Sequence, residues 1–383
     1  MRIKIIGGGP AGLYFALLMK KSDPAHELIV YERNAPDDTF GWGVVFSDKT
    51  LSYLENNDQE SHARITESFE TWDNVEVVHK GQRITIRGNK FSGIARLELL
   101  NILQERCRAL NVDLRFRSKV SATEISADAD LIVGADGVNS FVRQTYDEHF
   151  QPSLSAGKNK YIWYGTRQLF HGLTLTFRAT QAGVFAAHSY KFNKMTSTFI
   201  VECDAETWTR ADFETMTDEA TRAYLGEVFA DDLDGQELLS NNSKWINFIN
   251  VRNKHWSHRN IVLLGDALHT AHFSIGSGTK LALEDAIALH DCFQRTQNNI
   301  AAALSEFEAT RKPVIEAYQE AAEESRVWFE NAKDYAHLEP LAFAYELMTR
   351  SKKIDYENLR RRDPHFIAAY ENSRRLSANP RKD

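Results

Sequence analysis

The chain has 383 residues, of which 43% are hydrophobic and 26% charged, and its formal net charge is −7. This composition is typical of a folded protein with a sizeable core, and the length predicts two closely packed domains. No long basic run offsets the negative charge, which argues against nucleic acid as the main partner. No apolar stretch reaches the roughly 18 residues of a membrane span, and three widely spaced cysteines favour a reducing cytoplasmic setting.

A glycine-rich turn follows the first predicted strand, residues 2–6, and precedes an apolar helix. The turn has the pattern G-x-G-x-x-G, in which Gly7 permits the tight turn, Gly9 lets the backbone approach a pyrophosphate, and Gly12 lets the helix pack closely on the sheet. The next strand ends in Glu32, whose carboxylate can accept hydrogen bonds from a ribose. These features predict a bound dinucleotide, and the alternative is a glycine-rich turn in an unrelated α/β domain.

Predicted elements continue with a helical segment over residues 48–69, a strand over 83–87 and a helix within 91–110. Arg96 lies near the start of that helix, where its guanidinium can reach a phosphate or ribose, or can be a surface charge.

After a strand at 112–116, a buried strand at 130–134 ends just before Asp136 and Gly137. The carboxylate of Asp136 in this turn could bind a ligand. The alternative is an ordinary turn without such a role, because Asp-Gly is a common turn sequence.

The pattern changes after residue 150 to a series of strand-like runs. They predict a mostly antiparallel sheet, interrupted by a helical stretch over residues 211–229. The runs are residues 160–166, 173–180, 183–192, 197–204 and 245–252.

A buried strand at residues 260–264 then returns the chain to the nucleotide domain, and Asp266 follows it. Residues 276–278 open a helix whose N-terminus can meet a phosphate or a flavin ring edge, and residues 279–331 are largely helical. His269 and His272 form H-x-x-H without the acid of a zinc-protease motif, so no metal site is expected.

We therefore expect an α/β fold with a discontinuous Rossmann-like nucleotide-binding domain over residues 1–150 and 255–300. The antiparallel sheet domain would cover residues 151–254 and bind the substrate, and a helical region would cover residues 301–383.

Together the motifs resemble those of the FAD-dependent aromatic hydroxylases, the single-component flavoprotein monooxygenases, and the resemblance covers nearly the whole chain. It implies that FAD is the dinucleotide. Two positions depart from the usual pattern, because Phe273 replaces a proline and Lys280 replaces an asparagine. The residues implied to bind FAD are Gly7, Gly9, Pro10, Ala11, Gly12, Glu32, Arg33, Trp42, Gly43, Val44, Arg96, Asp136, Gly137, Gly265, Asp266, Gly276, Ser277, Gly278, Thr279 and Lys280.

The departures point to a subgroup. Several segments resemble the salicylyl-CoA 5-hydroxylases, with the flavin half of anthraniloyl-CoA monooxygenase, and also the tryptophan hydroxylase of violacein biosynthesis. The sequence of residues 269–280 resembles the CoA-ester group more than the tryptophan hydroxylase. The segments are residues 41–45, 159–166, 197–203, 272–276 and 325–330.

The resemblance implies that NADH or NADPH reduces FAD, that O₂ adds to give a flavin C4a-hydroperoxide, and that this species hydroxylates an electron-rich ring. A ring hydroxyl or amino group donates electrons to the carbon para to it. This would explain 5-hydroxylation of a 2-hydroxy- or 2-aminobenzoyl thioester.

Candidate catalytic residues are aromatic or basic. His272, beside the flavin loop, is the first candidate for a base near the ring hydroxyl, and alternatively it shapes the loop by a backbone hydrogen bond. Tyr164, His188 and Tyr190 lie on predicted strands and can line the substrate pocket or belong to the core. Trp42 can cover the flavin or pack the turn.

The favoured substrate is an aryl-CoA, with salicylyl-CoA first and tryptophan or another free aromatic as the alternative. Other classes left open are a flavin reductase without oxygen insertion and a non-catalytic flavin-binding protein. The choice of NADH or NADPH, and of monomer or homodimer, is also open. Cations that could contact a CoA tail are Arg167, Lys191, Lys194, Arg326 and the run 360–362, which is otherwise a solvated face.

Overall fold

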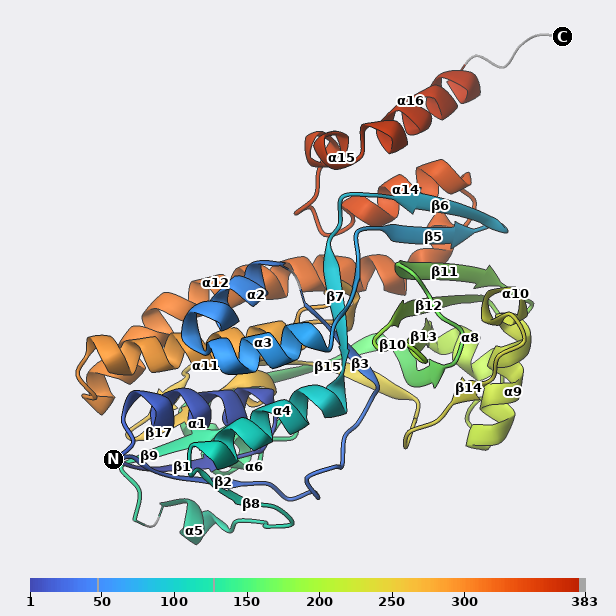
Figure 1. The fold of residues 1–383 in the computed structure, drawn as a ribbon. Helices are drawn as coiled ribbons and strands as arrows, with labels where there is room; N and C mark the ends of the chain where they lie inside the picture. Colours follow the sequence, from blue (N-terminus) through green and yellow to red (C-terminus); the bar gives the residue numbers. More distant parts are fainter. Residues whose placement is uncertain (47, 127, 379–383) are drawn as a thin grey trace, which may run out of the picture.

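The computed structural model describes residues 1–46, 48–126 and 128–378, and it contains two main sheets beside which a long helix runs (Figure 1). The first sheet has six strands in the order β16-β17-β9-β1-β2-β8, all parallel except β16. Its central strands are apolar because both faces are covered by other elements. The strands are β1 (Arg2–Ile6), β2 (Glu27–Tyr31), β8 (Asp113–Arg115), β9 (Leu131–Gly134), β16 (Ser257–His258) and β17 (Ile261–Leu263).

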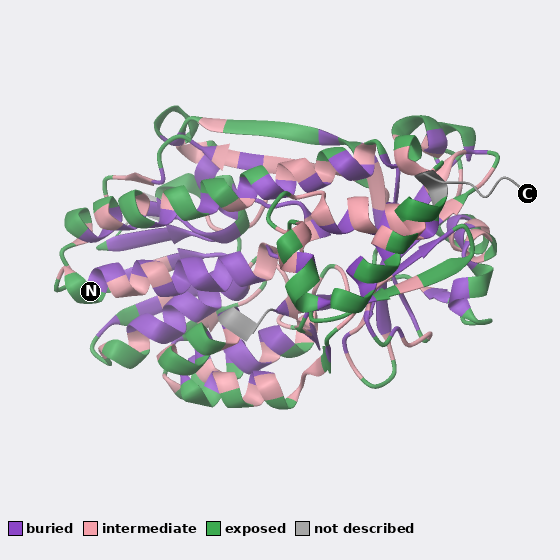
Figure 2. Cartoon of the chain, turned by 90° about the horizontal axis from the view of Figure 1, so that it is seen from above, coloured by how far each residue is buried: buried purple, intermediate pink, exposed green. Residues whose placement is uncertain are grey.

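Helices α1 (Pro10–Ser22), α4 (Arg96–Ala109) and α11 (Gly278–Arg295) pack in the core of this half. Pro10 stands in the first turn of α1, where its missing N–H costs nothing. The ten residues from Pro10 to Met19 are all buried, so α1 is an internal helix and not a surface one. Figure 2 shows the buried residues along the sheets and inner helices, with exposed residues on the outer helices.

The second sheet has eight strands in the order β14-β10-β13-β12-β11-β5-β6, with β15 paired to β10. All its pairs are antiparallel except β5 with β11, which agrees with the predicted mostly antiparallel sheet. The strands are β5 (Val75–His79), β6 (Gln82–Ile86), β10 (Pro152–Thr166), β11 (Leu173–Ala179), β12 (Val184–Lys191), β13 (Ser197–Cys203), β14 (Leu238–Leu239) and β15 (Ile246–Asn253).

Strands β5 and β6 lie outside the range 151–254, so this sheet draws on two distant parts of the chain. A small third sheet contains β3 (Gly43–Phe46), β7 (Phe91–Ala95) and β4 (Glu70–Trp72), and strands β5 and β6 of the second sheet lie between its β4 and β7 in the chain.

The helix predicted within residues 91–110 is observed as α4 (Arg96–Ala109), and residues 91–95 before it form strand β7, which pairs with β3 and β4. Gly93 of β7 packs closely on the carbonyl oxygen of Lys191, where a Cβ would lie 2.7 Å away.

Of the predicted helical stretch 211–229, residues 218–228 form α9 (Asp218–Val228), which Thr217 caps, and residues 211–217 are not helical. A separate helix, α8 (Ala205–Arg210), ends before this stretch, and Asp212 follows it at φ 59°.

Helix α12 (Ile300–Glu330) runs about 45 Å along both halves. The C-terminal helices α14 (Pro340–Thr349), α15 (Tyr356–Arg362) and α16 (Pro364–Ala378) pack beside β5 and β6, in one apolar cluster with Phe177 and Trp328. Among the described residues, no helix combines the length and hydropathy of a membrane span. The remaining helices are α2 (Asp48–Asn57), α3 (Gln59–Glu67), α5 (Ala122–Ser126), α6 (Phe141–Thr145), α7 (Asp147–Phe150), α10 (Ala230–Leu233), α13 (Ala332–Tyr335), η1 (Gly265–Ala267) and η2 (Phe273–Ile275).

Candidate active site

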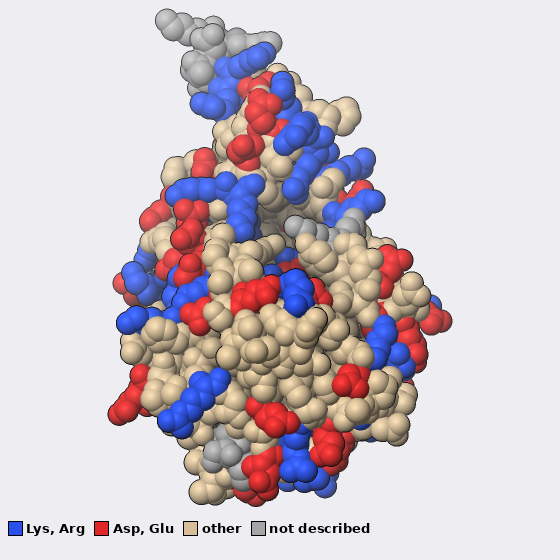
Figure 3. All heavy atoms as spheres, turned by 90° about the vertical axis from the view of Figure 1, so that its left-hand side faces the viewer, with Lys and Arg blue, Asp and Glu red and all other residues tan. Residues whose placement is uncertain are grey.

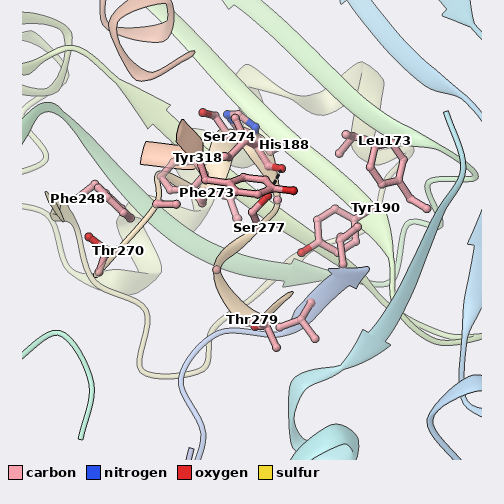
Figure 4. A pocket seen from close by; sticks show the side chains of 18 of the residues that line it. Leu173, His188, Tyr190, Phe248, Thr270, Phe273, Ser274, Ser277, Thr279 and Tyr318 are labelled. Atoms are coloured by element: carbon pink, nitrogen blue, oxygen red, sulfur yellow. Dashed lines mark hydrogen bonds between the residues drawn. The ribbon is translucent and has the colours of Figure 1, made fainter. Parts of the chain in front are cut away.

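A cavity of about 510 Å³ lies where elements of the two large sheets meet. This volume is within the usual range of a ligand pocket. One end is lined by glycine-rich turns and the other by aromatic side chains of the second sheet (Figure 4). The residues predicted to bind FAD that line it are Gly9, Pro10, Ala11, Gly43, Val44, Arg96, Gly137, Asp266, Gly276, Ser277, Gly278 and Thr279.

The three glycines of the first turn have different surroundings. Gly7 has a φ of +114°, and a Cβ there would lie 2.2 Å from the carbonyl oxygen of Ala135. A Cβ at Gly12 would lie 2.2 Å from the carbonyl oxygen of Gly7. A Cβ at Gly9 would meet no atom within 4 Å, because this residue faces the cavity. The N-terminus of α1 therefore offers free space, unpaired N–H groups and a positive dipole end, the combination that binds phosphate.

Two other charged groups at this end face the cavity. Arg96 and Asp266 both line it, and neither side chain has a hydrogen bond or ion pair with another described residue. Burial lowers the pKa of Arg96, and Asp266 opposes this. Enclosure by the protein raises the pKa of Asp266, while Arg96 and His269 lower it. The pair leaves guanidinium donors and carboxylate acceptors available to a ligand.

Other predicted cofactor residues do not line the cavity but support the turns that do. Glu32 accepts hydrogen bonds from the N–H groups of Gly8 and Asn34, both at 2.8 Å, and so braces the glycine turn. Asp136 accepts from the N–H groups of Phe141 at 2.6 Å and Val142 at 3.2 Å, which caps α6.

Three more of the predicted residues point elsewhere. The ring of Trp42 packs on Gly165, where a Cβ would lie 2.7 Å from it, so Trp42 packs the turn. Lys280 donates to the hydroxyl of Tyr318 at 2.7 Å and pairs with Glu284 at 3.3 Å. Arg33 is exposed and is not in the cavity wall. Gly7, Gly12 and Gly265 do not line the cavity. Each is a position where a neighbouring segment packs so closely on the glycine that a Cβ would lie 3.0 Å or less from it.

The aromatic end of the cavity is built by one face of the second sheet. Strand register places Tyr161 and Trp163 of β10 on the same face as Ile200 of β13 and His188 of β12, and all four line the cavity. Tyr190, also on this face, donates its hydroxyl to the carbonyl of Gly43 at 2.8 Å. Aromatic walls of this kind exclude water and hold a planar ring.

His188 is held by a buried carboxylate. Its Nε2 lies 2.6 Å from Oε1 of Glu202, and Asn159 donates to Oε2 of Glu202 at 3.1 Å. Burial raises the pKa of Glu202, but the hydrogen bond and charge of His188 outweigh it, so the net pKa is lowered. An ionised Glu202 can only accept a hydrogen bond from Nε2–H, so in a neutral His188 the proton is on Nε2 and the basic lone pair is on Nδ1.

Tyr164, a candidate catalytic residue for which a core position was the alternative, lies on the opposite face of β10. Its ring belongs to a separate apolar cluster with Phe185 and Phe199, and its hydroxyl donates to Asp218 at 2.9 Å. The side chains of a strand alternate between the two faces, so Tyr161 and Trp163 take the cavity positions instead.

His272 was the first candidate base, but it does not line the cavity. Its Nδ1 lies 2.8 Å from Oγ of Ser274 and accepts from the N–H of Ser274 at 3.4 Å, which caps the short helix η2. Burial lowers the pKa of His272 to about 4, so the ring is neutral at pH 7. The alternative role, shaping the loop by a backbone hydrogen bond, fits this geometry.

This burial predicts a pH effect on stability. The pKa of His272 falls from 6.5 to about 4 on folding, so between these values the unfolded chain binds more protons and stability rises with pH. Stability should be lost as the pH falls from about 6.5 to about 4, by up to about 3 kcal/mol. Urea unfolding at pH 7.5 and 5.0 measures it, and His272→Asn, which can still accept from Ser274, should reduce the difference. Equal pH dependence in both proteins would contradict this account.

Residues near the C-terminus complete the cavity wall and were not predicted. Arg350 donates to Oγ of Ser325 at 2.8 Å and to the carbonyl oxygen of Ser274 at 2.8 Å. The cavity wall also includes Tyr318, Met348, Lys353 and Ile354. No local motif marks these residues, because they reach the cavity only through the packing of α12 and α14.

Comparison with known proteins identifies the class. Residues 109–322 match the family model described as FAD binding domain. The chain is 42% identical over 361 residues to salicyloyl-CoA 5-hydroxylase of Streptomyces sp, covering 92% of this chain and 70% of that protein. It is 36% identical to protodeoxyviolaceinate monooxygenase of Chromobacterium violaceum, covering 92% and 95%. It is 33% identical to 3-hydroxy-4-methyl-anthranilyl-[aryl-carrier protein] 5-monooxygenase of Streptosporangium sibiricum, covering 94% and 97%.

Solved structures agree on the fold. The tetrameric form of 2-methyl-3-hydroxypyridine-5-carboxylic acid oxygenase superposes with a TM-score of 0.71 at 19% identity, over 94% of this chain and 97% of that one. PqsL of P. aeruginosa gives a TM-score of 0.70 at 19% identity, over 88% and 98%.

The chain therefore belongs to the FAD-dependent aromatic monooxygenases, and the predicted class and fold are confirmed. FAD and O₂ are accordingly its cofactor and oxidant.

Proposed function

We propose that this enzyme hydroxylates the ring of an ortho-substituted aryl-CoA thioester, with salicylyl-CoA as the first substrate to test and NADH or NADPH as the reductant. Two relatives that cover most of the chain carry names in which an aryl group is joined to CoA or to a carrier protein and is modified at position 5. The observation that carries the proposal is the cavity itself, which joins a phosphate-binding turn to an aromatic chamber with one buried, oriented histidine.

The residues at the glycine-rich end fit FAD. Space is open at Gly9, Gly276 and Gly278, and Arg96 and Asp266 have unused donors and acceptors. We assign the pyrophosphate to the N-terminus of α1 and the flavin to the start of α11. When bound, FAD supplies the electron transfer and oxygen activation that amino acid side chains cannot.

The residues at the aromatic end would orient and deprotonate the substrate. Tyr161, Trp163 and Phe273 surround the ring and keep water out. The hydroxyl proton of the ring passes to Nδ1 of His188, and the resulting imidazolium is paired with Glu202. The phenolate left behind is electron-rich at the carbon para to its oxygen, which directs the oxygen atom there.

Turnover of purified enzyme with salicylyl-CoA, anthraniloyl-CoA, free salicylate and tryptophan tests this proposal. We expect NADH or NADPH oxidation to be stimulated by a CoA ester and the product to gain one oxygen atom at C5. Activity with tryptophan or free acids alone would reject the thioester assignment while leaving the monooxygenase class unaffected.

A further inference from the structure

Exposed cations border the cavity in the segment after α14, at the end of α15 and in the turn between β6 and β7. Lys353 lines the cavity and is itself exposed, and its Nζ lies 3.8 Å from the ring centre of Tyr318. Arg361 and Arg362 end helix α15, and Arg87 and Lys90 flank the turn between β6 and β7. Figure 3 shows lysine and arginine side chains gathered over the C-terminal helices. We call Arg87, Lys90, Lys353, Arg361 and Arg362 the basic border.

The basic border is fastened to the cavity wall through Asn89. Asn89 is buried and lines the cavity, and Nη1 of Arg362 donates to its Oδ1 at 3.0 Å. A Cβ at Gly88 would lie 2.9 Å from the carbonyl oxygen of Arg362, so the two backbones are in contact. The N–H of Arg87 donates to Asp363 at 2.8 Å. The end of α15 and the β6–β7 turn thus form one rim.

The charge of this rim is not neutralised by the protein. Within the described part of the chain, no carboxylate lies within ion-pair distance of any basic-border residue or of Arg350, whereas the neighbouring Arg360 pairs with Glu357 at 2.8 Å. Asp363 is buried and already accepts two backbone N–H groups. A local excess of positive charge on a chain with net charge −7 is suited to an anionic ligand.

The other cations that the sequence left open are less suited to this role. Lys191 pairs with Glu70 at 2.7 Å, and Arg326 pairs with Glu323 and Glu330. Arg167 and Lys194 are exposed and do not line the cavity.

We infer that the basic border binds the phosphates of the CoA tail, with the pantetheine arm passing between Asn89 and Lys353 and the acyl group lying in the aromatic chamber. This inference rests on the proposed function and names the part of the protein that selects a CoA thioester over the free acid. Arg350 also lines the cavity, and the protein holds its guanidinium through three hydrogen bonds to neutral groups.

The double variant Lys353→Gln, Arg362→Gln tests the inference, with Lys353→Gln alone as a milder change. We expect KM for salicylyl-CoA to rise about tenfold with kcat unchanged. KM for the salicylyl thioester of N-acetylcysteamine, which has no phosphate, should not change. Lys194→Gln is the matched control and should leave both KM values as in the wild type. Far-UV circular dichroism and thermal melting check that the variants are folded.

Equal KM changes for both thioesters, or an equal change in the Lys194→Gln control, would overturn the inference. Turnover confined to a carrier-protein-bound salicylyl group would overturn it as well. Binding of CoA itself, measured by calorimetry, separates it from the proposed function. CoA binding that weakens in the double variant, without turnover of any CoA ester, would support the inference and reject the function. Turnover of salicylyl-CoA by the double variant with the wild-type KM would support the proposed function and reject the inference.

Discussion

Gly9→Val is expected to give a folded protein that binds FAD much more weakly. Gly9 has φ −78° and ψ 178°, a conformation that valine adopts without strain, and a Cβ there meets no protein atom within 4 Å. The added methyl groups instead enter the cavity where we assign the pyrophosphate. Overpacking of this size weakens binding by about 10- to 100-fold. The ratio of flavin to protein absorbance after purification, and titration of the apoprotein with FAD, measure the effect.

Gly12→Ala is the contrasting variant. Its Cβ would lie 2.2 Å from a backbone oxygen, so α1 must move from the sheet and stability as well as FAD should be lost. Gly226→Ala in α9 is the matched control, since a Cβ there meets nothing within 4 Å and removing a helical glycine should stabilise slightly. Full FAD content and unchanged affinity in Gly9→Val would show that the phosphates lie elsewhere.

His188→Gln is expected to lower kcat for ring hydroxylation about 100-fold or more, because general base catalysis typically contributes this much. Glutamine has similar size and can still donate to Glu202, but it cannot take up a proton. Activity of the variant should recover in part as the pH rises and the substrate hydroxyl ionises without a base. The rate of product formation at saturating substrate, measured from pH 6 to 9, is the readout.

Tyr164→Phe is the control for this prediction. Tyr164 lies on the other face of the same sheet, so its loss should cost about 1 kcal/mol of stability without a change in kcat. A wild-type kcat and pH profile in His188→Gln would remove His188 from the mechanism. A large fall of kcat in Tyr164→Phe would mean that sheet integrity, and not the base, controls the rate.

The dinucleotide turn could be predicted because its sequence signal is local. Gly12 is required by a backbone contact to Gly7 within one contiguous strand–turn–helix unit, whereas Gly7 is required by Ala135 of a distant segment but stands in the same short motif. The class also followed from short motifs, including the turns around Asp136 and Asp266, and the comparisons confirm it. The apolar runs placed strands β10, β11, β12, β13 and β15 of the second sheet, whereas β5 and β14 were not predicted and the strand predicted at 83–87, β6, was not assigned to this sheet.

The face of the sheet on which each side chain lies was harder to predict, because it depends on how neighbouring strands are paired. Tyr164 and Tyr161 belong to the same predicted strand, and alternating burial alone does not say which face meets the cavity. Similarly, His272 stands in a motif beside the glycine loop, but its ring turns inward to cap η2. The pair of His188 and Glu202 joins neighbouring strands, β12 and β13, and appears only once their register is known.

The sequence by itself determined that this chain belongs to the flavin-dependent aromatic hydroxylases and predicted a dinucleotide at the N-terminus of its first helix, because those signals lie in contiguous segments. Only the tertiary structure decided which aromatic residues form the chamber and which charges stand at its mouth. Arg350, Lys353 and Arg362 are far along the chain from Asn89, and long-range packing of the C-terminal helices on β5 and β6 brings them together. No local pattern encodes such a contact, since the free energy that specifies it comes from burial of apolar surface between distant segments.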